Sequence, residues 1–186
     1  MMSVAEAWTL LDDSDLLCSA EEADAAVGRI ADGINREMAG SFPLVLQVMT
    51  GASVFAGRLL PLLRFPLELD YIHATRYGNS TSGQQHIAWR VEPSRSVAGR
   101  TVLVVDDILD EGITLGAVRD KLLAMGAAEL RIAVFCDKEL GREKAIRADF
   151  VGVHLPNRYV FGFGMDVNGA WRNLPAVYAL KEEAAS

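Results

Sequence analysis

The sequence is poor in cysteine, in histidine and in long apolar runs. Its two cysteines, Cys18 and Cys136, lack the paired spacing of a zinc site or a redox motif, so we expect reduced structural thiols. Its three histidines show no spacing typical of a catalytic triad or a metal site. No apolar stretch approaches the roughly 20 residues that a membrane helix needs, and the N-terminus has no basic segment ahead of an apolar one. We therefore expect a soluble, cytoplasmic protein with no membrane partner.

Positive charge is also in deficit. The 18 Lys and Arg residues face 25 Asp and Glu residues, which gives a net charge of −7 at pH 7. Because non-specific binding to nucleic acid relies on clustered Lys and Arg, this balance argues against a nucleic-acid partner. It does not exclude an anionic small substrate, since backbone amides, one or two Arg residues and Mg²⁺ can reverse the field inside a pocket.

The chain has the size of one domain, because 186 residues can bury a substantial core and the sequence has no internal repeat, low-complexity tract or long linker. Apolar or alternating segments of strand length lie between segments of helical pattern. Strands are predicted at residues 43–49, 67–77, 86–93, 101–105, 130–136 and 150–155. This alternation predicts an α/β fold, a Rossmann-like parallel sheet with helices on both faces.

Two predicted helical segments have recognisable ends. Residues 4–40 are predicted to be a helical lead-in, in which Ser19 and Glu22 have the spacing of a capping box. The helix that follows the strand at 101–105 is predicted to close at Gly126, because glycine suits the C-terminal end of a helix. Each end is predicted from one or two residues.

The segment TVLVVDDILDEGITL at residues 101–115 joins a buried strand to four acids and a glycine. In open parallel sheets, ligands bind beyond the carboxyl ends of the strands, where loops lead into helix N-termini. Gly112 permits a close backbone approach or a positive φ, and the amides of residues 110–114 can form an anion cradle that the hydroxyl of Thr114 extends. This arrangement predicts a phosphate site.

Asp106 and Asp107 need a different ligand from the phosphate. One or both carboxylates can accept hydrogen bonds from a ribose diol or help to hold hydrated Mg²⁺. The combination therefore indicates a phosphorylated ribose. The alternative is that the acids cap the following helix and are otherwise solvated.

Four motifs, taken in order, resemble one family. VLVVDDILDEGIT resembles the phosphoribosyl-pyrophosphate signature of type I phosphoribosyltransferases. VMTGAS is similar to the pyrophosphate-binding loop of the hypoxanthine-guanine branch, RYGNSTSG to its flexible catalytic loop, and the segment from FCDKELG to WRNLP to its C-terminal half. The resemblance covers roughly residues 43–178. It implies one domain over residues 1–186, with a core at about 41–155 and a small hood from about 1–40 and 156–186.

The resemblance implies a purine-salvage enzyme. The reaction is the Mg²⁺-dependent transfer of phosphoribose from 5-phosphoribosyl 1-diphosphate to N9 of a 6-oxopurine base, hypoxanthine or guanine, which gives IMP or GMP and pyrophosphate. The resemblance also implies a homodimer or a homotetramer. Two alternatives stay open: a xanthine-preferring phosphoribosyltransferase, and a non-catalytic nucleotide-sensing regulator of the pyrimidine-attenuator type. Such regulators share the acidic loop but lack the tail FGFGMD…WRNLP.

Catalytic roles are carried over from the family to single residues. Asp110 has the position of the general base at purine N7, and Arg172 that of the arginine on the pyrophosphate. Tyr77 begins the catalytic loop, which runs to Gly83 and is expected to close over the site as a lid. The predicted Mg²⁺ ligands are Asp106 and Asp107, and Asp166 matches the acid associated with a second Mg²⁺.

Substrate-binding roles follow in the same way. Lys138 is expected to donate to purine O6, Tyr159 to stack on the ring, and the Val160 backbone to read the ring edge. Asp106 and Asp107 are assigned to the ribose hydroxyls, and residues 110–114 to the 5′-phosphate. The complete predicted set is Asp106, Asp107, Glu111, Gly112, Ile113, Thr114, Lys138, Tyr159, Val160, Thr50, Gly51 and Arg76.

Three positions depart from the family pattern. Glu111 stands where Thr is frequent, and we expect its side chain to turn outward while its amide still donates. Thr50 stands where Lys is frequent, at a position that commonly acts through its backbone in a strained or cis peptide. Arg76 stands where Ser is usual, and it can supply a cation to the diphosphate.

Overall fold

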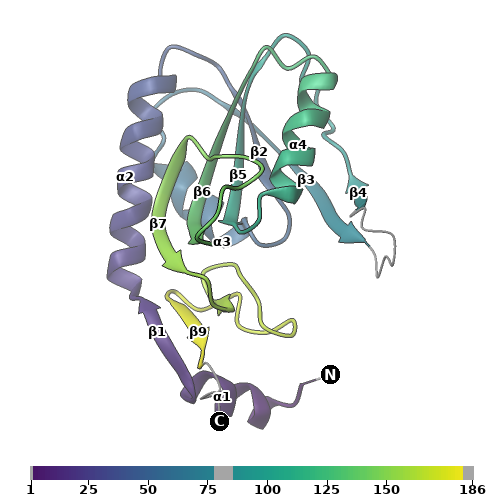
Figure 1. Ribbon diagram of the computed structural model, residues 1–186. Helices are drawn as coiled ribbons and strands as arrows, with labels where there is room; N and C mark the ends of the chain where they lie inside the picture. Colours follow the sequence, from purple (N-terminus) through teal and green to yellow (C-terminus); the bar gives the residue numbers. More distant parts are fainter. Residues whose placement is uncertain (1, 78–85, 182–186) are drawn as a thin grey trace.

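The computed structural model describes residues 2–77 and 86–181 (Figure 1). A six-stranded sheet lies at its centre, in the order β4-β3-β2-β5-β6-β7. All neighbouring pairs are parallel except β3 with β4, which closes one edge of the sheet in antiparallel fashion. The strands are β2 (Leu44–Val48), β3 (Glu68–Tyr77), β4 (His86–Val91), β5 (Thr101–Leu109), β6 (Glu129–Glu139) and β7 (Phe150–Pro156). The predicted parallel sheet is confirmed.

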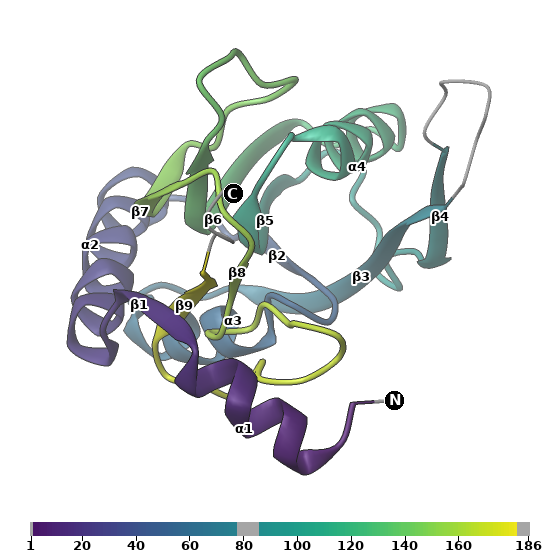
Figure 2. The same ribbon diagram turned by 60° about the horizontal axis from the view of Figure 1, so that its bottom comes forward.

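Helices cover both faces of this sheet, as predicted (Figure 2). In β5, Leu103 and Val105 belong to the core formed with α2 (Ala20–Met38) and α3 (Ser53–Leu59). Val102 and Val104 of the same strand belong to the core on the other face, formed with α4 (Ile113–Ala124). A short 3-10 helix, η1 (Leu60–Leu62), follows α3. Because successive residues of a strand point to opposite faces, the continuous apolar run of β5 is what a sheet covered on both sides requires.

The predicted start of α2 is confirmed. The Glu22 amide donates to Ser19 Oγ at 3.2 Å, and the Ser19 amide donates to Glu22 Oε2 at 2.8 Å, which completes a capping box. Gly126 has a φ of +92° and its amide donates to Leu123 O, so it closes α4 as predicted.

The N-terminal segment corrects the prediction of one helical stretch over residues 4–40. The chain forms α1 (Val4–Asp12), then the strand β1 (Ser14–Cys18), and only then α2. The strand forms because β1 pairs with β9 (Val177–Leu180), from the other end of the chain. A helical pattern read over a local window cannot detect a partner so far away in sequence.

The hood is a small antiparallel sheet in the order β1-β9-β8, where β8 is Val160–Phe161 (Figure 2). Helix α2 packs on β7 and β6 of the central sheet, so the N-terminal part of the hood is α1 and β1 rather than all of residues 1–40. Within the hood, helix α1 contacts the segment that carries Trp171. The rings of Trp8 and Trp171 meet edge to face at 4.9 Å, and Trp171 Nε1 donates to Ala7 O at 2.9 Å.

The two central strands run further than predicted. The ladder between β5 and β6 continues to the pair Leu109 and Asp137, so Asp106 and Asp107 lie within β5 rather than in a loop after it. Lys138 likewise lies within β6, because β6 also pairs with β7 as far as Glu139. Adjacent acidic residues are typical of a loop, but pairing with the neighbouring strands keeps the backbone of Asp106 and Asp107 in the sheet.

Within the two described ranges, no helix has the length and the apolar content that crossing a membrane would require.

Candidate active site

A cavity of about 300 Å³ lies at the carboxyl ends of the central strands. This is the position that ligands take in open α/β sheets. It is lined by the end of β2 and the turn after it, by β3, by the stretch from β5 into α4, and by one arginine of the hood. The lining residues are Val48, Met49, Thr50, Gly51, His73, Ala74, Thr75, Asp106, Asp107, Ile108, Leu109, Asp110, Gly112, Thr114, Leu115 and Arg172.

Two neighbouring carboxyl groups form the floor of this cavity. The side chains of Asp106 and Asp107 are buried, and each accepts a backbone hydrogen bond: Asp107 N donates to Asp106 Oδ1 at 3.0 Å, and Ile108 N donates to Asp107 Oδ1 at 2.9 Å. Burial, followed by the negative charge of Asp107, raises the pKa of Asp106 well above its ordinary value. Burial also raises the pKa of Asp107, although the positive charge of Arg172 opposes this. Two charges at this place therefore need a cation or hydroxyl donors beside them.

Asp106→Asn should make the protein more stable and less active. In the metal-free protein we expect the free energy of unfolding to rise by about 1–3 kcal/mol, because the amide keeps the shape and the acceptor oxygen without a buried charge. The raised pKa of Asp106 means that the folded protein holds a proton that the unfolded chain loses, so this contribution to stability falls as the pH rises above 3.8. Urea denaturation of the wild type and of Asp106→Asn, at several pH values from 3.8 upward, measures the difference in the free energy of unfolding.

The exposed residue Asp120, on α4, provides the matched control for this change. Asp120→Asn should leave the pH dependence of stability as it is in the wild type. A lower stability of Asp106→Asn than of the wild type at neutral pH would contradict the cost assigned to the buried charge.

Two glycines close the cavity around Asp107. A Cβ atom on Gly51 would lie 2.0 Å from Asp107 Oδ2, and a Cβ atom on Gly164, where φ is +104°, would lie 2.1 Å from Gly51 O. The turn after β2, the strand β5 and the hood therefore meet in close contact, and only glycine fits at both places. Thr50 and Gly51, which the sequence assigns to a pyrophosphate-binding loop, line the cavity, and the peptide bond between Met49 and Thr50 is cis.

The predicted phosphate loop leads from β5 into α4. Gly112 has a φ of +82°, and a Cβ atom there would lie 3.0 Å from the side chain of Ile146. Gly112 is also the N-cap residue of α4, so the residue at the cap position has no side chain to cap the helix. Of the two acids that follow the strand, Asp110 pairs with Lys138 and Glu111 pairs with Arg142.

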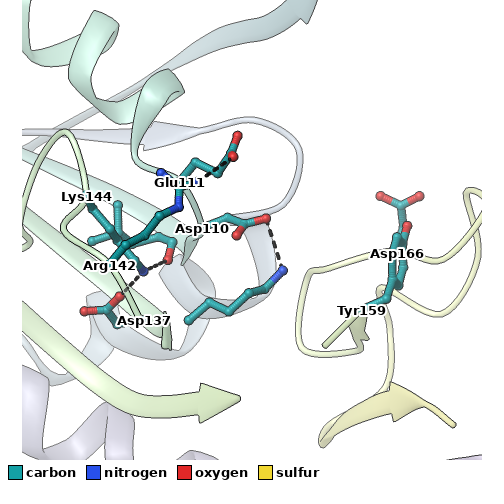
Figure 3. A network of polar contacts seen from close by, with 9 residues as sticks. Asp110, Glu111, Asp137, Arg142, Lys144, Tyr159 and Asp166 are labelled. Carbon is teal, nitrogen blue, oxygen red and sulfur yellow. Dashed lines mark hydrogen bonds and ion pairs between the residues drawn. The ribbon is translucent and has the colours of Figure 1, made fainter. Parts of the chain in front are cut away.

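A second cavity of about 250 Å³ adjoins the first and shares Asp107, Ile108, Asp110 and Arg172 with it. Here Lys138 Nζ lies 3.1 Å from Asp110 Oδ2, and only 11% of the Lys138 side chain is exposed. The other lining residues are Tyr159, Val160, Met165 and Asp166. Tyr159 and Asp166 lie across the site from Asp110 (Figure 3). The structure thus brings the residues predicted for the purine to one cavity.

The hood side of this cavity carries a phenol, a carboxylate and a guanidinium. Tyr159 is 54% exposed, and its hydroxyl donates to Asp166 O at 3.3 Å. Partial burial, followed by the charge of Asp166, raises the pKa of Tyr159, so the phenol stays protonated. The Arg172 guanidinium pairs with the Asp166 carboxylate and donates to Gly164 O at 2.7 Å. The Gly169 amide donates to the other Asp166 oxygen at 2.8 Å.

The residues predicted to bind Mg²⁺ lie at two places. Among residues 2–77 and 86–181, no group of three or more His, Cys, Asp or Glu side chains could hold a metal ion. Asp106 and Asp107 form one acidic pair in the first cavity, whereas Asp166 lies in the second and is engaged by Arg172. Any metal held by Asp166 would therefore occupy a separate position.

The catalytic loop lies largely outside the described residues. Arg76 and Tyr77 end β3, and nothing is described of their side chains or of residues 78–85, so the predicted lid and the predicted roles of both residues stay predictions.

Four residues near the site were missed by sequence reasoning. His73 and Thr75 of β3 line the first cavity. Arg142 and Lys144, from the loop between β6 and β7, reach the acidic stretch: Arg142 Nη2 lies 3.0 Å from Glu111 Oε1, and Lys144 Nζ donates to Leu109 O at 2.6 Å. The signal that could have found Arg142 is Glu111 itself, since an additional acid beside a phosphate site needs a neighbouring cation. Glu111 turns toward this loop.

Comparisons with known proteins agree with this geometry. Residues 17–168 match the phosphoribosyl transferase domain family. The chain is 34% identical to the hypoxanthine-guanine phosphoribosyltransferase of Bacillus subtilis, over 91% of this chain and 94% of that protein. It is also 34% identical to the bifunctional protein TilS/HprT of Listeria innocua, where the match covers 94% of this chain but only 27% of the longer relative. The crystal structure of a hypoxanthine-guanine phosphoribosyltransferase from Bacillus anthracis, with HEPES in the active site, superposes with a TM-score of 0.84. That match has 29% identity and covers 90% of this chain and 98% of the other.

Proposed function

Because the chain belongs to the hypoxanthine-guanine phosphoribosyltransferase family, we propose that it transfers phosphoribose from 5-phosphoribosyl 1-diphosphate to N9 of hypoxanthine or guanine. The products are IMP or GMP and pyrophosphate, so the reaction salvages purines. One observation carries this proposal: two adjoining cavities, one suited to a sugar phosphate and one to a planar base, share Asp107, Ile108, Asp110 and Arg172. The bond that forms between sugar and base would lie at this junction.

The first cavity suits the phosphoribosyl group. The turn from Asp110 to Thr114 leads into the N-terminus of α4, where backbone amides and the helix dipole favour a 5′-phosphate. Asp106 and Asp107 lie on β5, just before this turn, and can accept hydrogen bonds from the ribose hydroxyls. Two buried carboxyl groups with raised pKa values are also a fitting place for a divalent cation. When bound there, Mg²⁺ would supply positive charge that neutralises the diphosphate leaving group.

The second cavity suits a 6-oxopurine. Lys138 is a largely buried donor on this cavity, so it can donate to O6 of hypoxanthine or guanine. Adenine would place its amino group against that donor and leave the N–H of Lys138 that points to the base without an acceptor. Tyr159 is exposed enough to stack on the ring, and Val160 of β8, the next residue, also lines the cavity.

Asp110 has the place of the proton acceptor, since it lines both cavities. As N9 attacks C1′, the carboxylate can take the proton from purine N7, and its charge favours the cationic sugar that develops in the transition state. The ion pair with Lys138 fixes the directions of both side chains. Arg172 also lines both cavities, so its guanidinium can exchange Asp166 for an oxygen of the diphosphate. A lid formed by residues 77–83 would exclude water from this cationic sugar.

The assembly and the compartment are part of the same proposal. We propose a homodimer or a homotetramer that acts in the cytoplasm without a nucleic-acid partner. Cys18 and Cys136 are buried free thiols, which is consistent with a reducing compartment.

An assay of five bases tests the proposal. The purified protein is incubated with Mg²⁺, 5-phosphoribosyl 1-diphosphate and, in turn, hypoxanthine, guanine, xanthine, adenine or uracil, and nucleotide and pyrophosphate are measured. We expect conversion of hypoxanthine or guanine, with adenine and uracil at least about 1,000-fold less efficient. Conversion of neither hypoxanthine nor guanine would contradict the proposal. Conversion of xanthine alone would establish the xanthine-preferring alternative. A protein that binds nucleotide but converts no base would be the regulator.

A further inference from the structure

We propose that Lys144 is a positioning residue, which holds Asp110 and Lys138 in the alignment that transfer to the base requires. The proposal rests on the function proposed above and deepens it. Lys144 comes from the loop between β6 and β7, and only 10% of its side chain is exposed. A lysine is rarely buried to this extent unless it is paired.

Both partners of Lys144 directly precede a residue of the site. Its Nζ donates to Leu109 O at 2.6 Å and pairs with the Asp137 carboxylate (Figure 3). Leu109 ends β5 one residue before Asp110, and Asp137 lies on β6 one residue before Lys138. Leu109 and Asp137 are also opposite each other in the ladder between the two strands. One ammonium group therefore joins the two strands at the point where they deliver the ion pair of Asp110 and Lys138.

The same loop supports the residues on the other side of Asp110. Arg142 pairs with Glu111 at 3.0 Å, and Ile146 packs against Gly112, where a Cβ atom would lie 3.0 Å from the Ile146 side chain. The stretch from Leu109 to Gly112 is thus held at three of its four residues by one loop. The fourth, Asp110, has a side chain that is 41% exposed and faces the cavity.

This arrangement has a catalytic consequence, because a misplacement of about 1 Å can lower a rate about 100-fold. Lys144 neither lines the two cavities nor contacts the site of the base. Its effect on the reaction would pass through Leu109 and Asp137. Loss of Lys144 would also leave the partly buried Asp137 carboxylate without its lysine. The experiments therefore have to separate the effect of this negative charge from the effect of losing the link between Lys144 and Leu109.

The main test is Lys144→Met, which keeps the length of the side chain and removes its charge and its donors. We expect kcat with hypoxanthine to fall about 10- to 100-fold, with KM for the diphosphate donor changed less than about threefold. The preference for hypoxanthine over adenine should fall as well, because Lys138 is displaced together with Asp110. Lys144→Arg, which keeps a donor and a charge, should restore part of kcat.

Two further variants separate the tether from the charge and from general loss of stability. In Lys144→Met with Asp137→Asn, the unpaired carboxylate is absent but the tether to Leu109 is still lost, so kcat should stay low. Lys121→Met removes a lysine on α4 that pairs with Glu92 at 2.6 Å, and it should leave kcat unchanged. If Lys144→Met lowers only the melting temperature, while kcat per folded molecule stays at the wild-type value, the proposal is wrong. Full recovery of kcat in the double variant would also overturn it.

Hydrogen exchange gives a readout that does not depend on turnover. In Lys144→Met, the amides of residues 107–113 should exchange several-fold faster than in the wild type, and those of α2 should not change. If the wild type converts no base, the proposed function fails, and the exchange experiment still decides whether Lys144 holds this stretch. Unchanged exchange at residues 107–113 would contradict the positioning role. If Lys144→Met does not fold, kcat and hydrogen exchange are measured for Lys144→Arg and Asp137→Asn instead. The proposal would be overturned if both variants had the kcat and the exchange rates of the wild type.

Discussion

Asp110→Asn should lower kcat by about 100- to 10,000-fold, the range expected when a positioned general base is removed. KM for 5-phosphoribosyl 1-diphosphate should change much less. Asparagine has the shape of aspartate and can still contact Lys138, whose Nζ lies 3.1 Å from Asp110 Oδ2, but it cannot accept the proton from purine N7. Steady-state kinetics with hypoxanthine and guanine, repeated over a range of pH, measure both parameters.

Asp120→Asn is the control, because the same chemical change is made on the exposed face of α4. It should have wild-type kcat and KM. Equal losses in kcat and in donor affinity for Asp110→Asn would remove the argument for a base, and would mean that the carboxylate serves the ground state and the transition state alike.

Lys138→Ala should abolish most of the discrimination between 6-oxopurines and adenine. A site that hydrogen-bonds a polar group of its substrate rejects an analogue without that group by about 10,000-fold or more. Lys138 is the largely buried donor of the base cavity, so its removal should lower the ratio of kcat/KM for hypoxanthine to kcat/KM for adenine by about 1,000-fold. The ratio is the quantity to measure, because loss of Lys138 also removes the partner of Asp110 and lowers every rate.

Lys121→Ala provides the comparison, since Lys121 also forms an ion pair with a carboxylate but lies on α4. Its hypoxanthine-to-adenine ratio should equal that of the wild type. An unchanged ratio for Lys138→Ala would show that another group recognises O6.

The central sheet could be predicted from sequence because its signals are local. β-branched runs such as that of β5 identify covered strands, and the pair of Ser19 and Glu22 marks the start of α2 by itself. The hood could not be predicted as a sheet, because β1 and β9 come from opposite ends of the chain and each is short. The ends of β5 and β6 were missed for a related reason, since their polar residues are kept in the sheet by neighbouring strands.

The site was predictable as far as its residues belong to ordered motifs. The acidic stretch and Lys138 meet because they lie at the carboxyl ends of the neighbouring strands β5 and β6, and Tyr159 joins them because it directly precedes β8 of the hood. A motif does not show which residues elsewhere in the chain contact it and hold it in place. Arg142 and Lys144 are ordinary surface residues by type, and only the folded chain shows that one meets Glu111 and the other is buried between Leu109 and Asp137.

The two tryptophans of the hood give the protein an optical reporter of its own. Trp171 directly precedes Arg172, and its ring meets that of Trp8 at 4.9 Å, so the fluorescence of this pair depends on how α1 and the Arg172 segment are packed. The third tryptophan of the sequence, Trp89, lies on β4 at the far edge of the central sheet, with Lys121 Nζ 5.4 Å from the centre of its ring. The packing of the hood and the surroundings of β4 can therefore be followed separately by intrinsic emission, without an attached dye, once single-tryptophan variants separate the two sources.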